Sequence, residues 1–311
     1  MTRLPVIVGF GGINPAGRSS GHHGYRRLVY EQLAAGKQQS TLKALAALMR
    51  CDAEEQSILA NTLVRKIHDN LFDPGHYRAN KQAMMTGLQN APLSFTLKKN
   101  QLPEQLPPTW RVTELDNQQV QITATEPLSV MFPDGRASKV NSAGQLPTGF
   151  NPEALYQSRS HPRGLQLTVF GASDAVQSLG IPWQTIQDKV PGDQIAVYAS
   201  SAMGQLDFNG SGGMLQSALL GKRVSAKNCP LGLAEMTADF VNAYILGSVG
   251  ATGANVGACA TFLYNLRQGI TDIRAGNCRV AVIGSSEAPI TPEVIEGYRT
   301  MGALAEDDAL L

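Results

Sequence analysis

The stretch of residues 247–266, GSVGATGANVGACATFLYNL, constrains the fold most, because it is rich in small residues and carries no charge. Its glycines let backbone segments pass close to one another. Residues 261–274 then repeat apolar side chains at three- and four-residue spacing, which predicts a helix. These side chains are Phe262, Leu263, Leu266, Ile270 and Ile273. Cys259 therefore lies where a strand is expected to turn into a helix.

A cysteine at that position has two interpretations. Unpaired N–H groups and the helix dipole stabilise an anion at a helix N-terminus, and a thiolate is such an anion. Because the thiolate is the nucleophilic form of cysteine, Cys259 is predicted to be reactive without a neighbouring histidine. Small residues also surround buried structural cysteines, so a purely structural role is the alternative.

The rest of the second half of the chain alternates between helix and strand patterns. A helix is predicted around residues 165–179, strands at residues 195–199 and 280–284, and a further helix from Pro292. This order favours a mainly parallel, layered sheet. Residues 5–10 are apolar and β-branched, which predicts a buried first strand ending at Gly11 and Gly12.

The composition excludes several classes of protein. The 311 residues are 43% apolar, enough for one large or two medium-sized domains. A net charge of +1, from 26 basic and 25 acidic residues, gives no electrostatic basis for binding nucleic acid. The four cysteines lack the spacing of a zinc site or a disulfide framework, so we expect reduced thiols, a cytoplasmic location and no metal.

Cofactor, membrane and secretion signals are also weak. The glycines at positions 9 and 11 do not continue into a dinucleotide-binding pattern, because Asn14 stands where the third glycine is needed, and we expect no cofactor. Residues 241–266 are long enough to cross a membrane, but their asparagines and glycines make a span unfavourable. The apolar run at the start is too short for a signal peptide.

Residues 25–160 have a different character from the rest. Helical patterns are followed by a proline-rich connector at residues 102–108, and two alternating runs at residues 110–113 and 120–123 flank Asp116 and Asn117 as in a hairpin. We expect an α+β insertion or cap subdomain here.

The segment Gly257-Ala258-Cys259-Ala260-Thr261 resembles the nucleophile region of the β-ketoacyl synthases, and residues 273–276, 280–284 and 290–304 continue the resemblance in order. It covers roughly residues 163–311 and the first strand. Gly250-Ala251-Thr252 stands where the family usually has Gly-Pro-Asn, which indicates a divergent branch. The resemblance implies a thiolase-like, layered α/β/α fold. Residues 1–24 and 161–311 would form its N-terminal half, one of two pseudo-symmetric halves, with residues 25–160 inserted.

The same resemblance implies a function in fatty acid or related polyketide biosynthesis. Cys259 would take an acyl group from a carrier-protein or coenzyme A thioester, and its own backbone N–H would help to stabilise the oxyanion. Malonyl thioester would then decarboxylate and attack the acyl group. The family's catalytic histidines are expected beyond residue 311, since none of the five histidines present matches a family position.

The resemblance further implies an acyl carrier protein as partner and a homodimer. Lys222, Arg223 and Lys227, before a helix predicted to open at Pro230, would receive the acidic carrier protein; an ordinary solvated face is the alternative. A competing function for the whole chain is that of a non-catalytic ketosynthase-like partner subunit.

Overall fold

The computed structural model describes residues 4–87, 91–288 and 290–309. It divides into two compact units, residues 1–72 with 140–311, and residues 73–139. The second unit is shorter than the insertion predicted at residues 25–160. The helices that precede residue 73 and the segment that follows residue 139 belong to the larger unit instead.

A parallel sheet forms the centre of the larger unit. Strand β10 (Ile195–Ser200) pairs in parallel with β12 (Val280–Ser285) over all six residues and with the short β11 (Thr252–Gly253) on its other side. Every residue of β10 is buried. The predicted strands at residues 195–199 and 280–284 and their parallel arrangement are thereby confirmed.

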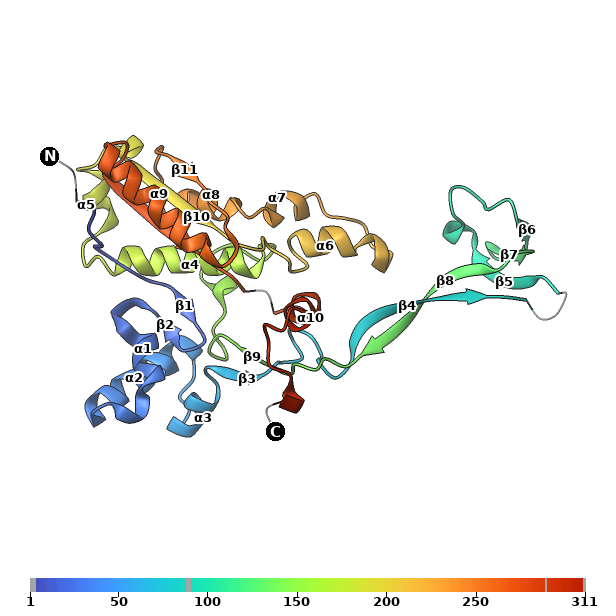
Figure 1. Cartoon of the computed structure of the whole chain (residues 1–311), viewed down its shortest axis with the longest axis horizontal. Coiled ribbons are helices and arrows are strands. Elements are labelled where there is room, and N and C mark those ends of the chain that lie inside the picture. The colour runs from blue at the N-terminus through green and yellow to red at the C-terminus, as the bar shows by residue number, and fades with distance from the viewer. Residues whose placement is uncertain (1–3, 88–90, 289, 310–311) are drawn as a thin grey trace. The chain divides into compact units, whose positions relative to one another are not determined.

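Helices cover both faces of this sheet, as Figure 1 shows. Odd-numbered residues of β10 pack in one hydrophobic cluster with α8 (Met236–Val241) and with residues of α4 (Arg163–Gln177). On the other face, Ala196 and Tyr198 pack with Ile273 of α9 (Thr261–Ala275) in a second cluster. Successive side chains of a strand point to opposite faces, so the arrangement is an α/β/α layering. Tyr198 Oη donates a hydrogen bond to Asp272 at 2.5 Å and joins β10 to α9.

The predicted helices at residues 165–179, at residues 261–274 and from Pro292 correspond to α4, α9 and α10 (Pro292–Thr300). The helix expected to open at Pro230 is broken. Helix α7 (Asn228–Gly232) ends at Leu233, whose backbone is extended, and α8 is followed by a π-helical turn, Asn242–Leu246. The apolar spacing predicted one continuous helix because it does not reveal the break between α7 and α8.

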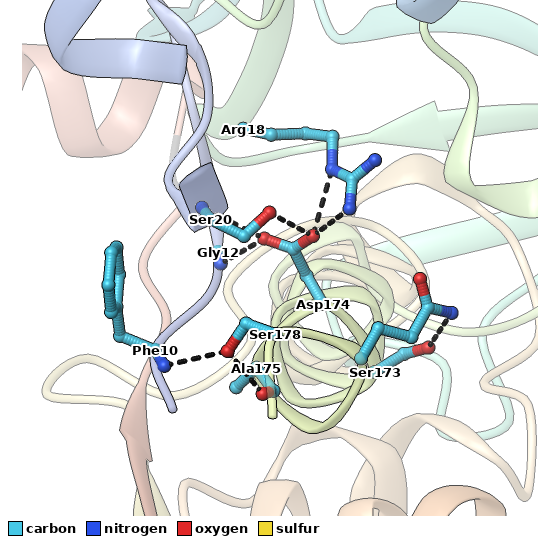
Figure 2. Close-up of polar contacts among 9 residues, drawn as sticks. Phe10, Gly12, Arg18, Ser20, Ser173, Asp174, Ala175 and Ser178 are labelled. Atoms are coloured by element: carbon cyan, nitrogen blue, oxygen red, sulfur yellow. Dashed lines mark hydrogen bonds and ion pairs between the residues drawn. The ribbon is translucent and has the colours of Figure 1, made fainter. Parts of the chain in front are cut away.

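The N-terminal segment corrects the prediction of a buried first strand. Val6, Ile7 and Val8 are 70%, 85% and 69% exposed and belong to no strand. The segment lies instead against the C-terminal half of α4, where the Phe10 N–H donates to Ser178 Oγ at 2.9 Å (Figure 2). A β-branched run favours an extended backbone but cannot supply the neighbouring strand that burial in a sheet requires.

Asp174 of α4 anchors the next part of the chain (Figure 2). Its side chain is 1% exposed and accepts hydrogen bonds from Gly12 N at 3.0 Å, Ser20 N at 3.3 Å and Ser20 Oγ at 2.7 Å. Arg18 completes the set with an ion pair to Asp174 and a bond from Nε at 2.8 Å. The short hairpin of β1 (Ile13–Asn14) and β2 (Gly17–Arg18) is thereby fixed to the helix layer.

The remaining elements of the larger unit are mostly short. Helices α1 (His23–Leu28), α2 (Ala35–Met49) and α3 (Glu55–Ala60) precede β3 (Val64–Lys66), which pairs antiparallel with β9 (Ser142–Gly144). Helices α5 (Trp183–Gln187) and α6 (Ser211–Gln216) complete the unit. No helix in the described ranges combines the length and the apolarity needed to span a membrane.

Residues 73–139 form a unit of antiparallel strands. Strands β4 (Tyr77–Met85) and β8 (Leu128–Arg136) make a two-stranded ribbon, and β5 (Leu93–Lys98), β7 (Gln119–Ala124) and β6 (Trp110–Glu114) form a three-stranded sheet in that order. The predicted hairpin around Asp116 and Asn117 is the β6–β7 pair. Its inward residues are almost fully buried, namely Val120, Ile122 and Ala124.

Candidate active site

Cys259 lies at the N-terminus of α9, as the sequence predicted. It is the middle residue of a 3-10 turn, Ala258–Ala260, that leads directly into the helix, and its side chain is exposed. A loop of residues 254–257 separates this turn from β11. The buried, purely structural cysteine considered as an alternative does not agree with this exposure.

The turn itself has an unusual backbone. Ala258 has φ of 47°, in the left-handed region that residues with a side chain seldom adopt. Thr261, which is 2% exposed, holds both sides of the turn: its Oγ1 donates to Ala258 O at 2.7 Å and accepts from Gly257 N at 3.0 Å. Gly257 leaves room for the ring of Tyr264, which a Cβ at this position would force to move.

The backbone N–H of Cys259 is available to a ligand. In the described part of the chain it has no hydrogen-bond acceptor, whereas the next N–H, that of Ala260, donates to Gly257 O at 2.9 Å. A free N–H at a helix N-terminus can donate to an oxygen that gains negative charge during attack on a carbonyl. The thiol and a potential oxyanion donor therefore belong to the same residue.

The surface around Cys259 is apolar. Val256, Phe262, Leu263 and Tyr264 are between 47% and 59% exposed. The buried residues of α9 are Thr261, Asn265, Gly269 and Asp272. Small and polar residues of α9 therefore face the sheet, and the apolar side chains of its first turn face outward. The hydrophobic spacing did not indicate this orientation.

A carboxylate that the sequence did not single out follows β12. Glu287 accepts hydrogen bonds from Ser201 Oγ at 3.0 Å and from the Ala202 N–H, so it joins the ends of β10 and β12. Burial raises the pKa of Glu287 above its ordinary value, although these hydrogen bonds oppose the shift. An isolated acid in a loop carries no sequence pattern that would have revealed it.

The three basic residues predicted to receive a carrier protein are all exposed and precede α7. Lys222 Nζ lies 5.1 Å from the centre of the Phe208 ring, and Lys227 Nζ is 3.3 Å from Ser160 Oγ. Lys222, Arg223 and Lys227 thus form a basic surface segment, residues 222–227.

His161 lies in a cluster of aromatic rings. Its ring is 4.9 Å from that of Phe240 and contacts those of Tyr156 and Tyr244. Burial, and secondarily the charge of Lys227, lower the pKa of His161. Burial in the same cluster raises the pKa of Tyr156 to about 12.

Comparison with known proteins identifies the family. The family model described as "Beta-ketoacyl synthase, N-terminal domain" matches residues 136–310. The chain is 48% identical to the β-ketoacyl-[acyl-carrier-protein] synthase FabY of Pseudomonas aeruginosa, over all of this chain and 52% of that protein. It is 29% identical to a 3-oxoacyl-[acyl-carrier-protein] synthase 2 of Staphylococcus aureus, over 56% of this chain and 42% of that one.

Comparison with solved structures leads to the same family. The crystal structure of the ketosynthase FabY from P. aeruginosa matches with a TM-score of 0.93 over 99% of this chain and 52% of that one. A β-ketoacyl synthase from Burkholderia phymatum, 15% identical, matches with a TM-score of 0.52 over the same shares of the two chains and shows the shared fold.

These matches confirm the predicted α/β fold of thiolase-like type. The chain spans about half the length of the curated relatives that it matches. The family model covers more than half of this chain, and FabY aligns with the chain along its whole length. The chain therefore belongs to the β-ketoacyl synthase family.

Proposed function

We propose that the protein containing this chain is a β-ketoacyl synthase of fatty acid or related polyketide biosynthesis, with Cys259 as its nucleophile. The observation that carries the proposal is the position of Cys259, exposed on the turn at the N-terminus of α9 and with its own N–H unpaired among the described residues. The names of the relatives, which are acyl-carrier-protein synthases, support this reaction class.

The reaction consists of two transfers. In the first, the Cys259 thiolate attacks the carbonyl carbon of an acyl thioester, and the resulting oxyanion accepts a hydrogen bond from the Cys259 N–H. The donor thiol then leaves, so that the acyl group is bonded to Sγ. In the second, a malonyl thioester loses carbon dioxide, and its enolate carbon attacks the acyl-cysteine carbonyl. A carbon–carbon bond forms and the Cys259 thiolate is released. Catalytic histidines outside this sequence would assist the decarboxylation, as the family resemblance implies.

Residues 222–227 are the proposed docking segment for an acyl carrier protein. Three exposed cations on six consecutive residues would attract an acidic partner and raise its association rate. We further propose a homodimer that acts in the cytoplasm. The absence of disulfides, all four cysteines being free, is compatible with that compartment.

Trapping of the acyl intermediate tests the central proposal. The protein, in its natural full length, is incubated with a short acyl thioester and analysed by peptide mass spectrometry. We expect the acyl group on Cys259, and none after Cys259→Ala. Cys229→Ala, which removes another exposed cysteine, serves as the control and should leave the acylation unchanged.

The same experiment distinguishes this proposal from the alternative of a non-catalytic partner subunit. If the unmodified protein carries no acyl group on Cys259, or if Cys259→Ala is acylated elsewhere at the original rate, the nucleophile assignment is wrong. The non-catalytic partner subunit then becomes the better hypothesis.

A further inference from the structure

Asn265 is the most completely bonded side chain on the buried face of α9. It is 0% exposed, and both ends of its amide are used. Oδ1 accepts from Asn255 N at 2.9 Å and from Asn255 Nδ2 at 3.3 Å. Nδ2 donates to Ser200 Oγ at 2.8 Å and to Gly284 O at 3.4 Å. An asparagine side chain can make about four hydrogen bonds, and here all four are made.

The partners of Asn265 meet at the carboxyl ends of the sheet. Ser200 is the last residue of β10, and Gly284 is next to the last residue of β12. Asn255 belongs to the loop between β11 and the turn that carries Cys259. Ser200 Oγ also donates to Asn255 O at 2.7 Å, so both backbone groups of Asn255 are held by buried side chains.

From Asn255 onward, the backbone that leads to Cys259 has little freedom. Two residues further on, the Gly257 N–H donates to Thr261 Oγ1, and Thr261 Oγ1 in turn donates to Ala258 O. Three buried polar side chains, those of Ser200, Thr261 and Asn265, thus fix the loop against the sheet and α9. The left-handed backbone of Ala258 is compatible with such a restrained loop.

Stability alone does not favour a polar network here. Well-packed apolar side chains would join α9 to the sheet without the cost of removing amides and hydroxyls from water. A fully satisfied buried network instead specifies one arrangement of the groups it joins, and the group joined here is the loop before the nucleophile. A displacement of about 1 Å in a reacting group can reduce a rate about a hundredfold.

We propose that Asn265 is a positioning residue for Cys259. By holding Asn255 against the ends of β10 and β12, it fixes the turn so that Sγ and the N–H of Cys259 are presented to the same carbonyl carbon and oxygen. The proposal rests on the proposed function, because it concerns the geometry of attack on an acyl thioester.

Two reactions of the same thiol separate positioning from folding. Acylation by a thioester needs both the thiol and the oxyanion donor in place, whereas alkylation by iodoacetamide needs only an accessible thiolate. In the full-length protein, we expect Asn265→Ala to slow acylation of Cys259 by 10- to 100-fold. Alkylation of Cys259 should change less than about threefold, since no oxyanion forms in that reaction.

Two further variants complete the experiment. Ser200→Ala removes a single hydroxyl of the network and should show the same separation of the two rates to a smaller extent. Thr271→Ala is the matched control on α9, because among the described residues its exposed hydroxyl donates only to Arg267 O, at 2.9 Å, and it should leave both rates unchanged. If Asn265→Ala does not fold, Ser200→Ala decides the question.

The outcomes are distinct. Acylation that is undiminished in Asn265→Ala or, if this variant does not fold, in Ser200→Ala refutes the positioning role, as does an equal loss of acylation and alkylation. A lack of acylation at Cys259 in the unmodified protein refutes the proposed function instead.

Discussion

Replacement of Asp174 by alanine should release the N-terminal segment from α4. The Asp174 side chain, 1% exposed, accepts from two backbone N–H groups, a hydroxyl and the Arg18 guanidinium. Each hydrogen bond to a charged group contributes about 1.5–3 kcal/mol. The Arg18 side chain is 41% exposed and regains water when its partner is lost, so the four contributions do not simply add. We expect a cost of about 3–5 kcal/mol, as for removal of one partner of a buried ion pair.

Amide hydrogen exchange measures this loss where it occurs. The N–H groups of Gly12 and Ser20 donate directly to Asp174, so their protection reports local opening of the segment. A loss of about 3 kcal/mol corresponds to roughly hundredfold faster exchange, at about 1.4 kcal/mol for each factor of ten. Asp188→Ala is the control, because within the described ranges this exposed carboxylate accepts only from Gln184 Nε2, at 2.9 Å. Should exchange at Gly12 and Ser20 accelerate less than about fivefold in Asp174→Ala, the anchor inferred from the structure would be wrong.

Three further changes test other parts of the larger unit. Burial keeps the pKa of His161 below the ordinary value of 6.5, so the unfolded chain binds more protons than the folded one as the pH drops below about 6.5. The stability of the protein should therefore fall over this range. Thermal melts from pH 8 to pH 5 should show a smaller decline in His161→Phe than in the unmodified protein. Ala258→Gly relieves a φ of 47° and should stabilise the fold by roughly 1 kcal/mol in chemical denaturation, a loss of stability being the contrary result. Glutamate at positions 222, 223 and 227 reverses the charge of the docking segment and should raise the KM for a carrier-protein thioester at least tenfold. The KM for the matching coenzyme A thioester should stay within twofold. Equal effects on the two KM values would exclude carrier docking at this segment.

Much of the fold and one part of the site follow from local sequence. The spacing of apolar residues placed α4 and α9 to within two residues at either end, and the alternation of helix with strand predicted the parallel sheet of β10 and β12. Gly257 and the helical pattern after it were enough to place Cys259 on the turn into α9. These features depend on backbone preferences and periodicity, which residues close in sequence determine.

Other features depend on residues far apart in sequence. The buried face of α9 is formed by Thr261, Asn265, Gly269 and Asp272. Asn265 donates to groups at the ends of β10 and β12, and Asp272 accepts a hydrogen bond from Tyr198 of β10. Ser200 and Asn265 are 65 positions apart, and no periodicity relates them. Polar residues on a helix normally predict its solvated face, so the pattern did not indicate that Thr261, Asn265 and Asp272 are buried.

The N-terminal segment shows the same limit. The sequence by itself determined that residues 5–10 favour an extended backbone, and that Cys259 precedes a helix. Only the tertiary structure decided that this segment lies exposed along α4, held by Ser178 and by Asp174, which lies 156 positions from Arg18 in sequence. Local preference selects the conformation of a segment, but its burial and its polar partners depend on surfaces that come together only when the chain folds.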